Sequence, residues 1–182
     1  SKNKPLDDSI NIQVLAKMTP GFTPADIENT MNEAAILAAR SNKSKISMTE
    51  ISEAIKRVSM GPEKHSLRVT ENDKRITAYH EAGHAIVSKF TPKSMPVEEI
   101  SIIPRGNAAG YTSYLPEDDK QFITKLYLEG NIKTCMGGRI AEELIFNDVS
   151  TGAYGDIIQA TNIARKMITE YGMSDKLGPI NY

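Results

Sequence analysis

The sequence predicts a mainly α-helical protein with a small β element, an α+β fold. Most of the chain carries apolar residues at three- and four-residue steps, which is the spacing of an amphipathic helix. A shorter stretch near 97–115 instead has two β-type runs, VEEISIIP and AAGYTSYLP, around a PRGN turn, and these predict a hairpin. A polar segment with Gly61-Pro62 at its start separates two groups of helices, so we expect two domains.

The N-terminal part, residues 10–58, reads as helical throughout and contains three predicted helices. The first, INIQVLAKM, ends at residues 19–21. The second begins with Thr23 as a plausible N-cap and Pro24 at the first helical position, and Asp26 is favourable to the helix dipole. The third, MTEISEAIKRV, has one apolar side. These helices can bury a modest core, but none of them carries residues suited to catalysis.

After a polar linker at 60–71, the helical pattern returns. Residues 72–90 are predicted to form one helix, and residues 119–146 another that is broken or tightly packed at Gly137-Gly138. A last helix is predicted from about residue 156 to 171.

Composition and charge exclude several classes of protein. The 182 residues are 40% apolar and 25% charged, with a net charge of −1, so nothing in the charge favours nucleic acid as a partner. No apolar run approaches the length that spans a bilayer, and the N-terminus lacks the apolar core of a signal peptide. The single cysteine, Cys135, excludes an internal disulfide and reads most simply as a buried apolar residue.

The segment TAYHEAGHAIVSKF contains a His80-Glu81-x-x-His84 motif. The four-residue spacing places both imidazoles on one face of a helix, as a zinc site requires. Glu81 is turned about 100° from His80, so it can border the open position of the metal without being a ligand. There it could exchange protons with a water that zinc activates. The alternative is a helix with two partly exposed histidines and a solvated glutamate.

A catalytic zinc site needs a third protein ligand, and three carboxylates are candidates. The extended motif HExxHxxGxxH is absent, and His65 in the polar linker reads as a surface residue. Glu142 and Glu143 lie on a predicted downstream helix. Asp156 taken alone resembles a helix N-cap. Physical reasoning from the sequence leaves the choice among these three open.

Several linked motifs resemble those of the FtsH-type ATP-dependent zinc metalloproteases. They are RITAYHEAGHAIV, ISIIPRGNAAGYTSYLPEDD, MGGRIAEELIF, VSTGAYGDIIQATNIARKMI and YGMSDKLGPI, in that order. The earlier TPGFTPADIENTMNEAAILAAR resembles the helical lid of the AAA ATPase module in that family. The similarity covers residues from about 10 to 182. Two positions depart from the family pattern, which usually has glycine in place of Pro24 and asparagine in place of Gly155.

The resemblance implies a zinc endopeptidase with His80, His84 and Asp156 as ligands and Glu81 as catalytic base. It returns Glu142 to a structural role, together with its neighbour in the sequence. It also implies an edge strand that binds extended substrates by backbone hydrogen bonds. The residues expected along this strand are Ile100, Ser101, Ile102, Ile103, Gly110 and Tyr111.

The resemblance further implies a lid at 1–59, a linker at 60–71 and a peptidase domain at 72–182 that is truncated at its C-terminus. No GxxxxGK[ST] loop is present, so ATP and Mg²⁺ would bind only in a full-length parent. That parent is expected to be a homo-hexamer that cuts unfolded or membrane-extracted proteins, with no nucleic acid partner. It would be anchored in the bacterial inner membrane, or an organellar membrane, with this part on the cytoplasmic side. The 182-residue piece itself is expected to be soluble and could be inactive.

Two other classes of function remain as alternatives. The chain could be a non-catalytic assembly or interaction module whose zinc is structural, with the fourth coordination position closed. It could also be a generic helical domain with a coincidental motif, in which case no metal would co-purify. Retention of Glu81 argues against the first alternative, because a structural zinc site needs no base. The linked motifs argue against the second.

Overall fold

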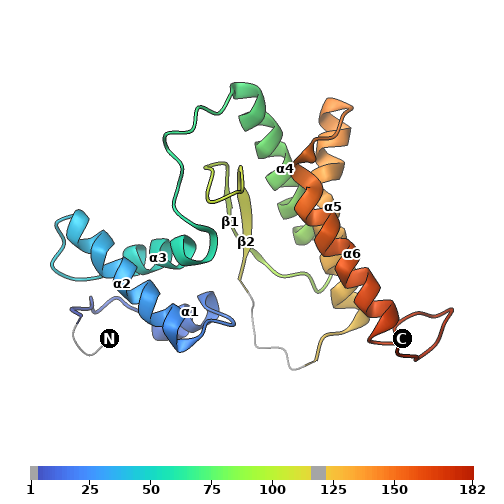
Figure 1. The fold of residues 1–182 in the computed structure, drawn as a ribbon, viewed down its shortest axis with the longest axis horizontal. Coiled ribbons are helices and arrows are strands. Elements are labelled where there is room, and N and C mark those ends of the chain that lie inside the picture. Colours follow the sequence, from blue (N-terminus) through green and yellow to red (C-terminus); the bar gives the residue numbers. More distant parts are fainter. Residues whose placement is uncertain (1–3, 116–121) are drawn as a thin grey trace. The chain divides into compact units, whose positions relative to one another are not determined.

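The computed structural model describes residues 4–115 and 122–182. It divides into two units, one of Ser1–His65 with Pro104–Asn107 and one of Ser66–Ile103 with Ala108–Tyr182. Within the described residues there are six α-helices, one short 3-10 helix and a two-stranded antiparallel sheet (Figure 1). This confirms the predicted α+β class, mainly helical with a small β element.

The N-terminal unit contains α1 (Ile12–Met18), α2 (Pro24–Arg40) and α3 (Met48–Met60). Thr23 caps α2 as predicted, and it forms a reciprocal capping box with Asp26. The three helices predicted within 10–58 are all present, but the segment is not helical throughout, because residues 41–47 between α2 and α3 form no helix. There the chain turns through Asn42, whose φ of 54° lies in the left-handed region that asparagine tolerates better than most residues.

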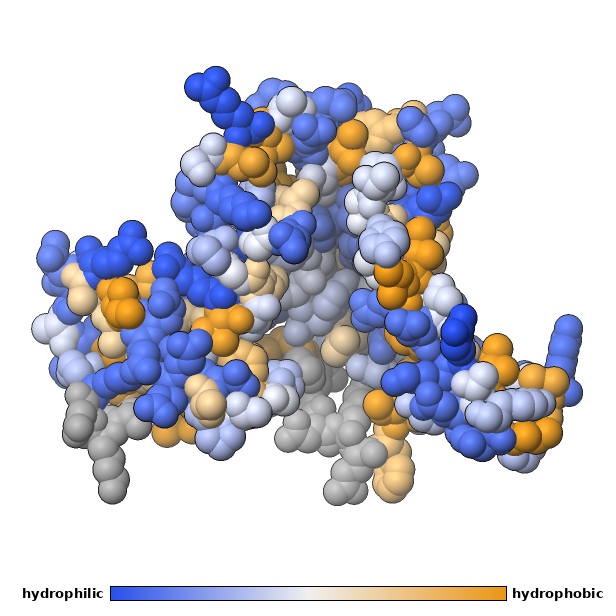
Figure 2. Space-filling model, in the orientation of Figure 1, coloured by the Kyte–Doolittle hydropathy of each residue, from blue (hydrophilic) through white to orange (hydrophobic). Residues whose placement is uncertain are grey.

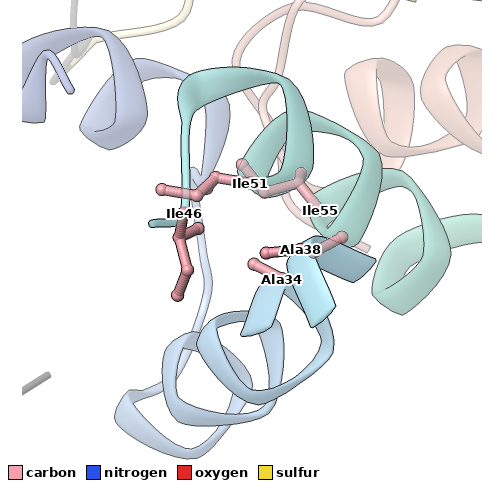
Figure 3. Packing of buried hydrophobic residues seen from close by; sticks show 6 residues of the cluster. Ala34, Ala38, Ile46, Ile51 and Ile55 are labelled. Atoms are coloured by element: carbon pink, nitrogen blue, oxygen red, sulfur yellow. The ribbon is translucent and has the colours of Figure 1, made fainter. Parts of the chain in front are cut away.

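The core of this unit lies between α2 and α3 (Figure 3). Small residues of α2, Ala34 and Ala38, face the larger Ile51 and Ile55 of α3, and Ile46 closes the cluster; all five are at most 6% exposed. Alanines let the two helices approach, and burial of each isoleucine stabilises the fold by roughly 1.5–3 kcal/mol. This small core explains why so short a group of helices folds together.

A buried arginine is the main polar feature of the N-terminal unit. Arg105, which belongs to the Pro104–Asn107 segment, is 2% exposed and pairs with both carboxylate oxygens of Glu53 at 3.1 and 2.7 Å. Its guanidinium also donates to Glu63 at 2.5 Å. A guanidinium can be buried at this depth only when such partners replace its water.

The C-terminal unit is built around a long helix pair. α4 (Glu71–Phe90) packs against α5 (Lys125–Phe146), and α6 (Tyr154–Thr169) packs on α5 after the 3-10 turn η1 (Thr151–Ala153). The hairpin of β1 (Val97–Ser101) and β2 (Tyr111–Tyr114) contacts α4. In this hairpin Ile100 pairs with Thr112, and Ser101 pairs with Tyr111.

Several predicted helix limits in this unit need correction. Of the predicted helix 119–146, residues 119–121 lie outside the described residues, and α5 begins only at Lys125, because Thr124 caps it. It is continuous through Gly137-Gly138, where it is tightly packed rather than broken. The N-cap of α6 is Ala153, which places Asp156 inside the first helical turn. The interpretation of Asp156 as an N-cap was therefore wrong.

The surface of the C-terminal unit carries several exposed apolar side chains. Leu144 on α5 is 78% exposed and Tyr154 on α6 is 71% exposed. In Figure 2 apolar residues are interspersed among hydrophilic ones on the face in view. Across 4–115 and 122–182, no helix has both the length and the apolar character needed to cross a membrane.

Candidate metal centre

Two glycines bring α4 and α5 into backbone contact. A Cβ placed on Gly137 would lie 2.6 Å from the carbonyl oxygen of Gly83, which is closer than side chains pack. A Cβ on Gly83 would in turn collide with the carbonyl of Gly137. The pair therefore lets the face of α4 that carries His80 and His84 press directly on α5.

A third glycine makes room for the two imidazoles. A Cβ on Gly138 would lie 2.5 Å from Nε2 of His80 and 2.6 Å from Nε2 of His84. Both rings thus occupy the space that any other residue at this position of α5 would fill. The absence of a side chain at Gly138 is what allows both Nε2 atoms to meet at one point.

His80, His84 and Asp156 converge at that point. The two Nε2 atoms are 3.0 Å apart, and Oδ2 of Asp156 lies 3.2 Å from that of His80 and 3.4 Å from that of His84. The potential ligand atoms of the three residues all lie within 4.8 Å of one another. Both histidines are buried, and the Asp156 side chain is 25% exposed. The group can therefore hold a metal ion.

The far side of each imidazole is held by a hydrogen bond. Nδ1 of His84 donates to the backbone carbonyl of Thr134 at 2.7 Å, and Nδ1 of His80 lies 2.5 Å from a carboxylate oxygen of Glu142. A carbonyl or an ionised carboxylate only accepts, so in the neutral rings the proton is on Nδ1. Each Nε2 then presents a lone pair to the convergence point, which is the arrangement of metal-ligating histidines.

Glu142 connects His80 to the turn that precedes Asp156. It is 2% exposed, and its second oxygen accepts a hydrogen bond of 2.6 Å from the backbone N–H of Ser150, the N-cap of η1. Burial alone would raise the pKa of Glu142, but the hydrogen bonds from Ser150 and His80 lower it below its usual range. The carboxylate is thus ionised and orients the ring without sharing the convergence point.

The electrostatics at this point call for a positive charge. Two nitrogen lone pairs and a carboxylate oxygen lie 3.0–3.4 Å apart, so the neutral rings supply no proton between them. Although burial opposes it, contact with both histidines lowers the pKa of Asp156 to about 2. The pKa of each histidine is raised against burial, chiefly by Asp156. A proton or a metal cation at this point would be stabilised by the three facing atoms. Two imidazole nitrogens with one carboxylate form a donor set suited to zinc.

Glu81 lies beside the metal group and is not part of it. Its side chain is buried, and the hydroxyl of Thr112 on β2 lies 2.8 Å from its Oε2. Burial raises the pKa of Glu81 above the usual carboxyl value, even though the Thr112 hydrogen bond acts in the other direction. A buried carboxylate with a raised pKa is a stronger proton acceptor than an exposed one.

Other residues singled out from the sequence lie elsewhere. Glu143 is exposed, and the His65 side chain is 75% exposed beside Glu63. Cys135 is buried as expected, and burial raises its pKa to about 11. Of the six residues expected along the edge strand, Ile100, Ile102 and Ile103 are exposed, Ser101 is partly buried, and Gly110 and Tyr111 are buried.

Four residues that contact the two imidazoles, Glu81 or Glu142 were not identified from the sequence. They are Thr112, Thr134, Gly138 and Ser150. Thr134 and Ser150 act through backbone groups, which leave no side-chain signal in a sequence. Gly138 lies in the Gly-Gly pair that was recognised as a packing feature, and that pair was the available signal.

Comparison with known proteins places both parts of the chain. Residues 67–182 match the model of peptidase family M41, and residues 9–53 match that of the AAA+ lid domain. A protein of a Thermoanaerobacter species named ATP-dependent zinc metalloprotease FtsH 1 is 57% identical over the whole chain. The ATP-dependent zinc metalloprotease FtsH of Caldicellulosiruptor bescii is 56% identical over the same length. The chain spans about 30% of the length of each relative. It belongs to peptidase family M41, among the FtsH-type zinc metalloproteases.

Proposed function

We propose that this chain carries the peptide-hydrolysing site of an ATP-dependent zinc endopeptidase. In this proposal His80, His84 and Asp156 are the zinc ligands and Glu81 is the general base. The observation that carries it is the convergence of three acceptor atoms within 4.8 Å, with a buried carboxylate next to them. The names of the relatives, which are zinc metalloproteases, support the choice of metal.

The chain supplies the ligand geometry through bonds on the far side of each ring. Thr134 and Glu142 fix the Nδ1 proton of His84 and His80, so each neutral ring directs the lone pair of Nε2 to the convergence point. Asp156 adds the negative charge that offsets part of a dication. Zinc, when bound, would polarise a peptide carbonyl and make a water molecule more acidic.

Glu81 would transfer the proton during hydrolysis. It would accept a proton from the attacking water and later pass it to the nitrogen of the leaving amine. Burial raises the pKa of Glu81, which makes its carboxylate a stronger acceptor for the proton of the attacking water. Thr112 contacts one of its two carboxylate oxygens.

The substrate class and assembly extend this proposal beyond the chain. We expect unfolded or membrane-extracted polypeptides as substrates, delivered by the AAA module of a homo-hexamer attached to the bacterial inner membrane. In the described part of the chain β1 pairs only with β2, and the exposed Ile100 lies on β1. An extended peptide could add to such an edge through backbone hydrogen bonds, which require no particular side chains.

Metal content and proteolysis of matched variants test the proposal. Mass spectrometry should find about one zinc per chain, lost in Asp156→Ala, retained in Glu143→Ala and retained with weaker affinity in Glu142→Ala. In the full-length protein, Glu81→Gln should keep its zinc but lose casein cleavage, since it removes only the base. Absence of zinc, or zinc that survives Asp156→Ala unchanged, would exclude the three-ligand site.

A further inference from the structure

A hydroxyl of the β-hairpin contacts the proposed base. Oγ1 of Thr112 lies 2.8 Å from Oε2 of Glu81 and 3.0 Å from the backbone carbonyl oxygen of the same residue. One hydroxyl has one proton, and an ionised carboxylate is a stronger acceptor than a carbonyl. The proton of Thr112 is therefore directed to the Glu81 side chain.

The hairpin is held at this distance by close packing. A Cβ on Gly110, one residue before β2, would lie 2.6 Å from Cγ2 of Thr77 and 3.2 Å from Cγ of Glu81, both on α4. Only a glycine permits this approach. Because side chains alternate along a strand, Thr112 faces α4 whereas the next hydroxyl, that of Ser113, faces the exposed Glu98 at 3.4 Å.

A base on a long side chain needs such a contact. Glutamate has three rotatable side-chain torsions, and a buried carboxylate with no donor would be both poorly oriented and destabilised. A donor on Oε2 selects one orientation and leaves Oε1 for proton transfer. We propose that Thr112 is the positioning residue for Glu81, an inference that rests on the proposed role of Glu81 as base.

Three variants of the full-length protein test this inference. Thr112→Val keeps the size and β-branching of threonine but removes the hydroxyl, Thr112→Ser keeps the hydroxyl, and Ser113→Ala is the matched control on the other face. We expect Thr112→Val to lower kcat for a peptide substrate about 10- to 100-fold, the effect of losing a hydrogen bond to a charged group. Its KM should change less than about twofold, because ground-state binding does not use Oε2 of Glu81.

Thr112→Ser should restore most of the lost kcat, and Ser113→Ala should leave it unchanged. Zinc content should be unchanged in all three variants, because none of the changes touches a ligand. A crystal structure of Thr112→Val without metal gives a readout independent of turnover, and the Glu81 carboxylate should move from its position or occupy more than one rotamer. If the valine variant does not fold, Thr112→Ala provides the same comparison without added apolar bulk.

Failure of this inference can be told apart from failure of the proposed function. If Glu81→Gln is inactive but Thr112→Val keeps the wild-type kcat, only the role of Thr112 is overturned. A loss of zinc in Thr112→Val, or an unmoved Glu81 in its crystal structure, would also overturn it. If Glu81→Gln cleaves peptides as the wild type does, the base is misassigned and both proposals fall.

Discussion

Replacement of Gly138 by alanine should abolish metal binding while leaving the helix pair intact. The added methyl group would lie 2.5 Å from Nε2 of His80 and 2.6 Å from Nε2 of His84, about 0.9 and 0.8 Å short of the 3.4 Å at which ordinary contact begins. Metal–ligand distances tolerate only about 0.2 Å. Both rings must therefore turn about their Nδ1 hydrogen bonds, which withdraws both Nε2 atoms from the convergence point.

The cost of this change to the fold is small. The atoms in conflict belong to side chains that can rotate, and alanine in a helix interior is about 0.5–1 kcal/mol more favourable than glycine. The unfolding free energy of the metal-free protein should stay within about 1 kcal/mol of the wild type. The zinc affinity should fall at least about 100-fold. Removing a single residue that hydrogen-bonds to one metal ligand already lowers metal affinity about 10- to 100-fold, and here two ligands are displaced.

Two other glycines provide the comparison. Gly137→Ala would press on the backbone of Gly83, which cannot rotate away, so we expect a net destabilisation of about 2 kcal/mol. Gly155→Ala on α6 has no neighbour within 4 Å of the added Cβ and should be neutral or slightly stabilising. Urea denaturation of the metal-free proteins and zinc titration against a chromophoric chelator measure the two effects separately.

A Gly138→Ala variant that binds zinc as tightly as the wild type would refute this reasoning. It would mean that the rings can meet a metal from positions the structure does not show. If Gly138→Ala lowered the unfolding free energy as much as Gly137→Ala does, the claim that Gly138 serves the imidazoles and not the helix contact would be refuted. The packing of α4 on α5 would then depend on both glycines.

Three more predictions concern residues around the site and in the N-terminal unit. Glu142→Gln should weaken zinc binding about 10- to 100-fold in a chelator competition, whereas the exposed Glu143→Gln should not. Glu50→Gln should lower the melting temperature at pH 6 but not near pH 2. Hydrogen bonds, the strongest of them from Lys43, lower the pKa of Glu50 to about 2. The stabilisation that the ionised Glu50 gives to the fold is therefore complete above the ordinary carboxyl pKa of 4.5 and is lost as the pH falls through 2. A difference in melting temperature that is the same at both pH values would contradict this. Arg105→Met should reduce the unfolding free energy by about 2 kcal/mol in urea, because two glutamates lose their cation, and an unchanged midpoint would contradict this.

The parts of the fold that follow local rules were predictable. Thr23 and Asp26 form a capping box because both groups lie within four residues of each other, so the start of α2 can be read directly. The start of α5 was placed too early because Thr124, with no acidic residue three positions later, gives a weak capping signal. The Arg105 ion pairs, which span 42 and 52 residues, have no local pattern at all.

The same division applies to the site. His80, Glu81 and His84 lie within one turn or so of one helix, so their relative placement follows from helical geometry. The contact of Thr112 with Glu81 spans 31 residues and depends on how closely the hairpin approaches α4. That approach is set by Gly110, whose importance is visible only once a Cβ is built on it.

The proposed third ligand shows most clearly which part of the site cannot be predicted from the sequence. Glu142 and Asp156 both contact the same imidazole, across 62 and 76 residues, and both follow the motif on helices. Spacing therefore favours neither. They differ in which ring nitrogen they meet: Glu142 is at Nδ1 of His80, whereas Asp156 is at Nε2 of both His80 and His84. The Nδ1 atoms of both rings are occupied by hydrogen bonds to Glu142 and to the Thr134 carbonyl. A metal that binds both rings can therefore lie only on their Nε2 side. The choice is thus made by ring orientation, which depends on Thr134 and the glycine contacts of α5 rather than on any pattern of residue types.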